Sequence, residues 1–161
     1  MRRTDKEMSS REEMDRVIRG SLVCRIALAV DGMPYIVPVS FGYDGEAIYL
    51  HTAREGRKID GFRSGGSVCF EFERGVELLR KSDDPCGWTF SYESVIGFGK
   101  IRELESPAQR ELGMKTIVAQ YSGKECAFGE DRLKNVRIWK IGIDSMTGKR
   151  SGRPPAAQPL L

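Results

Sequence analysis

The chain has 161 residues with a formal charge of +3, and it contains four cysteines but one histidine. This length fits one domain that can bury a core without disulfides. Basic residues form no long block interleaved with aromatics, which argues against a nucleic-acid-binding surface. The cysteines include no Cys-x-x-Cys pair and have no histidine cluster beside them, so we expect no metal site.

The first residues are charged and include no apolar segment, so we expect no signal peptide. No apolar run approaches the ~20 residues that a bilayer-spanning helix needs. We therefore expect a soluble, cytoplasmic protein with reduced thiols and no membrane partner.

The predicted elements begin with an amphipathic helix at 10–19, where Ser10 and Glu13 have the spacing of a capping box. Asp-Gly pairs at 31–32 and 44–45 are typical of hairpin turns. They separate three strands of a predicted antiparallel meander, at 24–30, 33–41 and 46–51.

The second half of the chain is predicted to contain three strands, two helices and a long connection. Ser106 and Pro107 are typical of a helix start. A long loop in a compact domain is often a lid, a binding loop or an interface element, and disorder is the alternative. The expected elements are a helix at 53–63, a strand at 67–73, an excursion at 74–87, a strand at 88–104, a helix at 107–121 and a strand at 135–143.

Six strands, mostly joined by hairpins, predict a mainly β fold. Antiparallel strands that must avoid open edges favour a small closed or split β-barrel with peripheral helices. We expect residues 1–150 to form a single domain. Residues from 145 onward are expected to be an irregular tail, and 151–161 a disordered C-terminal segment.

The stretch at 51–58 predicts a strand that runs directly into a helix. Thr52 and Glu55 have capping-box spacing, so the helix is expected to begin near Ala53. Helical offsets would place three cations beside His51 and Thr52: Arg54, Arg57 and Lys58. This is the chemistry of a phosphate or carboxylate socket, and a solvated basic face is the alternative.

The predicted strand at 33–41 contains Pro38, which cannot donate a hydrogen bond to a neighbouring strand. One side of this strand therefore faces either solvent or a planar heterocycle. In the second case the backbone of Val37, Val39 and Ser40 would bond the ring edge. Because the strand ending at His51 is the expected neighbour, ring site and phosphate socket would adjoin.

Several segments together resemble the pyridoxamine 5′-phosphate oxidase-like family of flavin-binding proteins, and within it the nitroimidazole-resistance branch. The segments lie at 25–30, 35–39, 49–53, 56–58, 85–88, 94–100 and 147–150. The resemblance extends over about residues 8–150. It implies a six-stranded antiparallel split β-barrel of the FMN-binding type, and a homodimer with two FMN molecules in the clefts between subunits.

The resemblance also implies which residues contact FMN. His51 and Thr52 stand where the oxidases have a Tyr-Thr pair, and Arg57 and Lys58 match their phosphate-binding Arg-Lys pair. Ser94 aligns with an FMN-contacting glutamine but is shorter. The expected cofactor-binding set is Arg25, Val37, Pro38, Val39, Ser40, His51, Thr52, Ala53, Arg57, Lys58, Trp88 and Ser94.

The function implied is that of an FMN-dependent oxidoreductase, which reduces a small nitroaromatic or quinone with an electron donor such as NAD(P)H. The oxidases' substrate-binding segment has no counterpart after Ile143, so oxidation of pyridoxamine phosphate is not expected. His51 is the candidate proton donor, with hydrogen bonding beside the phosphate as its alternative role. Two other functions stay open: a non-catalytic flavin carrier, sensor or electron-transfer protein, and a barrel that binds haem or a deazaflavin.

Overall fold

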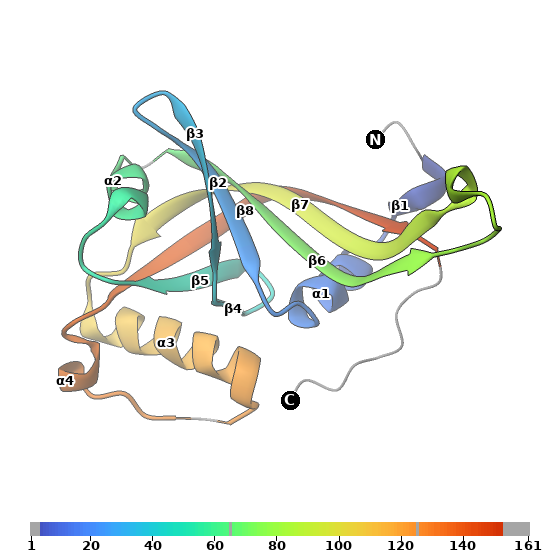
Figure 1. The fold of residues 1–161 in the computed structure, drawn as a ribbon. Coiled ribbons are helices and arrows are strands. Elements are labelled where there is room, and N and C mark those ends of the chain that lie inside the picture. Colours follow the sequence, from blue (N-terminus) through green and yellow to red (C-terminus); the bar gives the residue numbers. More distant parts are fainter. Residues whose placement is uncertain (1–3, 65, 125, 153–161) are drawn as a thin grey trace.

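A computed structural model describes residues 4–64, 66–124 and 126–152 (Figure 1). Within these residues the chain forms eight strands that belong to one antiparallel sheet, together with four α-helices and two short 3-10 helices. In chain order the elements are η1 (Thr4–Lys6), β1 (Glu7–Met8), α1 (Arg11–Arg19), β2 (Cys24–Val30), β3 (Met33–Val39), β4 (Phe41–Tyr43), β5 (Ala47–Thr52), α2 (Arg57–Arg63), β6 (Ser67–Leu79), η2 (Pro85–Gly87), β7 (Thr89–Glu103), α3 (Pro107–Ser122), α4 (Glu130–Leu133) and β8 (Arg137–Ser151).

The sheet curls into a split barrel. Its strand order is β3-β2-β6-β7-β8-β5-β4, and the short β1 pairs with β8. The two ends of this order, β3 and β4, are consecutive in sequence and are separated only by Ser40. The sheet must therefore bend round until its edges meet, with a split where β3 and β4 do not pair. This confirms the predicted mainly β, split-barrel fold, although the described residues form eight strands and not the six expected.

The predicted strand at 33–41 is two strands that break at Ser40. Residues 33–39 pair with β2, and only Phe41–Tyr43 pair with β5. The prediction that this strand lies beside the one ending at His51 is therefore right only for its last residue, Phe41, which pairs with Leu50. The three-stranded meander is wrong because its middle strand is two strands, of which one pairs with β2 and the other with β5, although both hairpin turns are correct.

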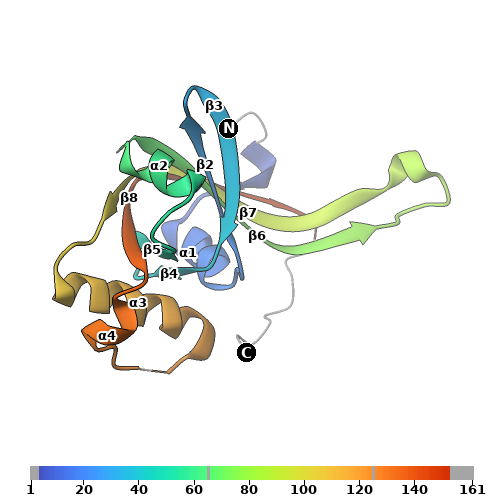
Figure 2. The same ribbon diagram turned by 60° about the vertical axis from the view of Figure 1, so that its left-hand side comes forward.

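The first six residues of the predicted excursion at 74–87 are strand. β6 continues to Leu79 and pairs with β7 as far back as Thr89, across an irregularity between Arg74 and Glu77. Gly75 adopts a positive φ of 63° there, which a glycine tolerates. The resulting β-hairpin, residues 74–93, projects from the barrel (Figure 2) and is called the arm below.

The predicted irregular tail is also strand. β8 extends to Ser151, with Thr147 opposite Ile96 and Arg150 opposite Glu93. Backbone pairing with β7 supplies the hydrogen bonds that a glycine-containing, charged segment does not signal by itself. Of the predicted disordered segment, 151–161, Ser151 belongs to β8, and residues 153–161 lie outside the described part of the chain.

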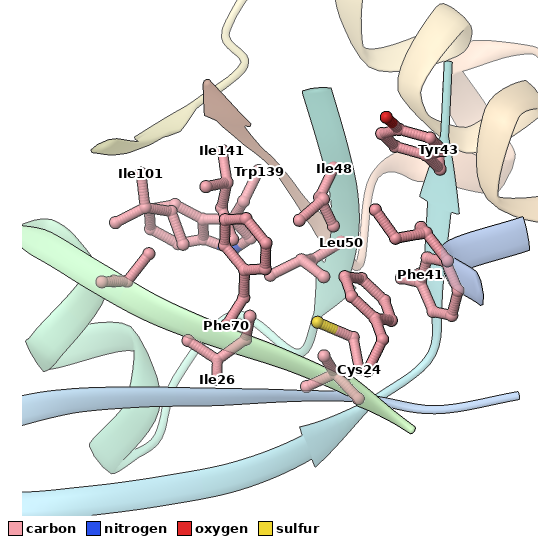
Figure 3. Packing of buried hydrophobic residues seen from close by; sticks show 14 of the residues in the cluster. Cys24, Ile26, Phe41, Tyr43, Ile48, Leu50, Phe70, Ile101, Trp139 and Ile141 are labelled. Carbon is pink, nitrogen blue, oxygen red and sulfur yellow. The ribbon is translucent and has the colours of Figure 1, made fainter. Parts of the chain in front are cut away.

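Buried side chains from the inner face of the barrel form the main core (Figure 3). Large apolar residues such as Phe70, Trp139 and Ile141 are almost completely buried in it. The helix α1 contributes Val17 and Ile18, and its predicted capping residue Ser10 accepts a hydrogen bond from the Glu13 N–H, 3.2 Å. A second cluster, which includes Tyr49 and Ile138, packs between the sheet and α3.

Two helices lie at opposite sides of β5. The helix α2 packs on β2, where a Cβ at Gly61 would come within 2.4 Å of Leu28. The helix α3 packs on β4 so closely that a Cβ at Gly42 would lie 2.4 Å from the Thr116 backbone. Its start is as predicted, because Ser106 accepts a hydrogen bond from the Gln109 N–H. The segment between β5 and α2, residues 53–56, is exposed.

Candidate functional site

The segment from β5 to α2 contains the predicted anion socket. The helix begins at Arg57, not near Ala53, and Gly56 is its N-cap, with φ of 129° and no side-chain hydrogen bond. The predicted capping box of Thr52 and Glu55 is therefore wrong. Residues 53–56 form a connection, so Arg54 does not share a helical face with Arg57.

The Thr52 side chain is committed to the core. Its hydroxyl donates to the Ala53 carbonyl oxygen, 2.8 Å, and accepts from Trp139 Nε1, 3.0 Å. Thr52 is 3% exposed, and the Trp139 ring packs edge-on against Phe62 of α2, with centroids 5.3 Å apart. These contacts fix the end of β5 relative to α2. A direct role of the Thr52 hydroxyl in ligand binding stays a prediction.

His51 is the next-to-last residue of β5 and has an unsatisfied ring nitrogen. Its Nδ1 atom is buried and has no hydrogen-bond partner among the described residues. Burial lowers the pKa of His51, and the nearby Lys58 ammonium lowers it further. The imidazole is therefore neutral near pH 7, and a buried unpartnered nitrogen is a group that a ligand can satisfy.

Arg57 and Lys58 present two positive charges at the start of α2. Neither forms a salt bridge with a carboxylate of the described chain, and the Arg57 guanidinium lies over the Tyr35 ring, 5.1 Å from its centroid. Tyr35 was missed as a site residue by the sequence analysis, although it begins a segment of the family resemblance. Two cations without a carboxylate partner among the described residues, one of them, Lys58, close to His51, are chemically suited to a phosphate.

The other predicted residues lie on β3 and on the outer face of the sheet. Arg25 is opposite Pro38 across β2 and β3, and its Nη1 atom forms an exposed ion pair with Glu71, 2.9 Å. Ser94 lies farther along on β7. Val37 and Val39 belong to β3, which is an edge strand of the sheet, so the position of Pro38 at an edge is confirmed.

Trp88 is not brought near the other predicted residues within one chain. It lies at the tip of the arm, where its Nε1 donates to the Ser82 carbonyl oxygen, 2.9 Å, and Arg80 lies over its ring. Both ribbon views place this tip at the opposite side of the molecule from α2 (Figures 1 and 2).

Three surface cavities lie along α3 and the segments beside it, with volumes of about 240, 630 and 300 Å³. None of these three is lined by a residue predicted to bind the cofactor. Of the predicted residues, Val39 and Thr52 are buried and the others are exposed or half-buried. A closed ring-binding cleft would therefore need a second surface.

The curled antiparallel sheet, with its open junction between β3 and β4, defines a split-barrel protein. The sequence model of the pyridoxamine 5′-phosphate oxidase family matches residues 10–150, and the chain belongs to this family. No helix of the described residues is long and apolar enough to cross a bilayer.

Solved structures agree with this assignment. A crystal structure of a candidate 5-nitroimidazole antibiotic resistance protein from Bacteroides thetaiotaomicron is 27% identical, with a TM-score of 0.78 over 89% of this chain and 85% of that one. A FAD and heme binding protein from Mycobacterium smegmatis is 20% identical and has a TM-score of 0.80, covering 94% of this chain and 77% of its own. At that identity the likeness establishes the fold alone.

Among curated proteins, an uncharacterized protein of Rhizobium meliloti (strain 1021) is 36% identical over 95 residues. The match covers 59% of this chain and 55% of the relative. The chain therefore aligns with about half the length of this relative.

Proposed function

We propose that this chain binds FMN as a homodimer and is an FMN-dependent oxidoreductase that reduces a small nitroaromatic or quinone. The observation that carries the proposal is the pair Arg57 and Lys58, two cations without a described carboxylate partner beside the buried His51 nitrogen. FMN carries a flat ring at one end and a phosphate at the other. A cationic socket at the end of a curled sheet suits such a molecule.

The similar structures support a flavin as the ligand. The Mycobacterium smegmatis protein is described as binding FAD and heme, and another similar structure, from Azotobacter vinelandii, is described as a flavocytochrome. We propose FMN because one phosphate suffices to satisfy Arg57 and Lys58. When bound, FMN would supply the hydride or electron transfer. The side chains of Arg57 and Lys58 would hold its phosphate, and the half-buried His51 would border the same end.

The outer face of the sheet supports the homodimer. Strand pairing places Ile36, Ala27, Cys69 and Phe98 in one row across β3, β2, β6 and β7. Ile36 is 62% exposed and Phe98 is 53% exposed. Exposed apolar side chains in one contiguous row are typical of an interface. We name this row the outer apolar row and infer that a second copy of the chain covers it.

The arm extends the same surface beyond the barrel. Leu78 is directly opposite Phe90 in the arm, and both are exposed. Phe90 and Phe98 lie eight residues apart on β7, an even spacing that places them on the same face of the strand. A second copy docked on the outer apolar row would therefore lie alongside the arm. We propose that Trp88, at the arm tip, contacts the cofactor or substrate region of the partner.

The four cysteines are free: Cys24, Cys69, Cys86 and Cys126. Free thiols fit our proposal that the protein works in the reducing cytoplasm.

A second function, electron transfer or flavin storage without a substrate, is favoured by one observation. The predicted cofactor residues line none of the three cavities described above, so no substrate pocket is apparent in a single chain.

Steady-state assays distinguish the two functions. The purified protein, loaded with FMN, is given NADH or NADPH and either a nitroaromatic or a quinone. We expect acceptor-dependent oxidation of the nicotinamide well above that of free FMN at the same concentration. Rates equal to those of free FMN with every acceptor, despite tight flavin binding, would favour the non-catalytic function.

A further inference from the structure

A second cluster of basic side chains includes Arg54 of the connection between β5 and α2. It lines the cavity of about 240 Å³. Four basic residues and two acidic residues contribute to its wall, together with Leu104 and Val136. The charged residues are Arg54, Arg110, Lys134, Arg137, Glu103 and Glu105. The wall therefore carries an excess of positive charge, and the proposed flavin socket uses none of these residues.

Two of the guanidinium groups are held in fixed orientations. Arg110 Nη2 donates to the carbonyl oxygens of Leu133 and Val136, 2.6 and 3.0 Å. Arg137 donates from Nη1 to both carboxylate oxygens of Glu103, 2.7 and 2.9 Å, and from Nε to the Arg54 carbonyl oxygen, 2.9 Å. These contacts remove much of the rotational freedom that a basic side chain normally loses when it binds a ligand.

The fixed groups retain unused donors. Guanidinium has five N–H donors, and the contacts above leave the Nε and Nη1 atoms of Arg110 and the Nη2 atom of Arg137 without acceptors among the described residues. The Arg54 side chain forms no ion pair or hydrogen bond with any described residue. Glu103 is paired with Arg137, and Lys134 lies 3.8 Å from Asp131, so Arg54 and Arg110 are left against Glu105 in the wall of the cavity.

We propose that this cavity binds a small oxyanion, a phosphate or a carboxylate, and that Arg54, Arg110 and Arg137 donate hydrogen bonds to it. Its volume lies below the range of about 300–1,000 Å³ usual for larger organic ligands. A phosphate monoester or a short carboxylic acid is the class that fits. Glu105 also lines the cavity and opposes the binding of an anion, which makes it a sensitive position for a test.

Isothermal titration calorimetry with inorganic phosphate, and separately with succinate, tests this site in a buffer free of both. We expect saturable binding of one or both anions. Arg54→Gln should weaken it at least about fivefold, because a charge-assisted contact is lost at a partly solvated site. Glu105→Gln should tighten it. Both side chains are exposed, so neither substitution should prevent folding.

The double substitution Arg57→Ala with Lys58→Ala is the matched control, because it removes the proposed flavin socket and leaves the cavity intact. Binding that persists in this control and weakens in Arg54→Gln supports the cavity as the site. Phosphate binding that disappears in the control and is unchanged in Arg54→Gln would overturn it, as would the absence of saturable binding by either anion. The result is independent of whether the protein binds flavin.

Discussion

The indole Nε1 of Trp139 donates a 3.0 Å hydrogen bond to the hydroxyl of Thr52, and both side chains are almost fully buried. This bond joins β8 to the last residue of β5, immediately before the connection to α2. Phe62 of α2 packs against the same indole ring. The position of the cationic helix start therefore depends on a buried contact that involves no charged group.

Thr52→Val should destabilise the fold. It leaves the Trp139 N–H buried without its acceptor, and we expect a loss of about 1–3 kcal/mol in the free energy of unfolding, measured by urea denaturation. Thr52→Ser keeps the hydroxyl and serves as the control. If the Thr52→Val protein keeps its stability but loses flavin affinity, the hydroxyl is a ligand group and its structural role is refuted.

Removing the two cations should weaken the binding of FMN through its phosphate. In the protein with Arg57→Ala and Lys58→Ala we expect the dissociation constant of FMN to rise at least about tenfold, since two charge-assisted contacts are lost. Riboflavin has the same ring without the phosphate and is the matched ligand. Quenching of flavin fluorescence gives both constants. Equal losses for FMN and riboflavin would contradict a phosphate socket.

His51 should make the fold less stable in mild acid. Its pKa is lowered in the folded protein, so below about 6.5 the unfolded chain binds more protons at this residue than the folded one. The resulting loss of stability develops as the pH falls from about 6.5 towards the lowered pKa. His51→Gln removes this contribution. We expect the wild type to lose unfolding free energy relative to the variant as the pH falls through this window.

The ¹H NMR titration of the lone histidine provides an independent check of this pH dependence, because the imidazole signals can belong only to His51. We expect a midpoint below about 6.5 without ligand. Phosphate bound beside Lys58 should raise the midpoint, since a nearby anion favours the charged imidazolium. A midpoint at the ordinary value that does not respond to any anion would contradict the burial of this ring.

A charge in the outer apolar row should disrupt the proposed dimer. Phe98→Asp places a carboxylate at the β7 end of this row, whereas Leu112→Asp changes an exposed apolar residue on α3, away from the row. Sedimentation equilibrium should show that wild type and Leu112→Asp are dimers and that Phe98→Asp dissociates. A wild-type protein that is monomeric at all concentrations would refute the shared cofactor site.

The sequence predicts those parts of the fold that local chemistry determines. The Asp-Gly pairs at 31–32 and 44–45 mark hairpins correctly because Asp31, Gly32 and Gly45 adopt positive φ, which few other residues tolerate. The caps at Ser10 and Ser106 are equally local, and both are found where predicted. Alternating apolar residues then place most of the strands.

The features that sequence analysis missed depend on distant partners. The arm and the end of β8 are strands because β7 pairs with both, and their charged residues and glycines do not indicate this. Thr52 bonds Trp139, which lies 87 residues away in sequence, so spacing alone suggested a capping role. The cavity at Arg54 joins residues from β7, α3 and β8, and only the folded chain brings them together.

The visible absorption spectrum of the purified protein, before and after denaturation and filtration, tests the central claim most directly. We predict the paired bands of a bound flavin, with FMN in the filtrate. FAD in the filtrate would confirm a flavin but refute the single-phosphate cofactor. A colourless protein that also takes up no added FMN would contradict the proposed function, and the assignment of Arg57 and Lys58 would fail with it.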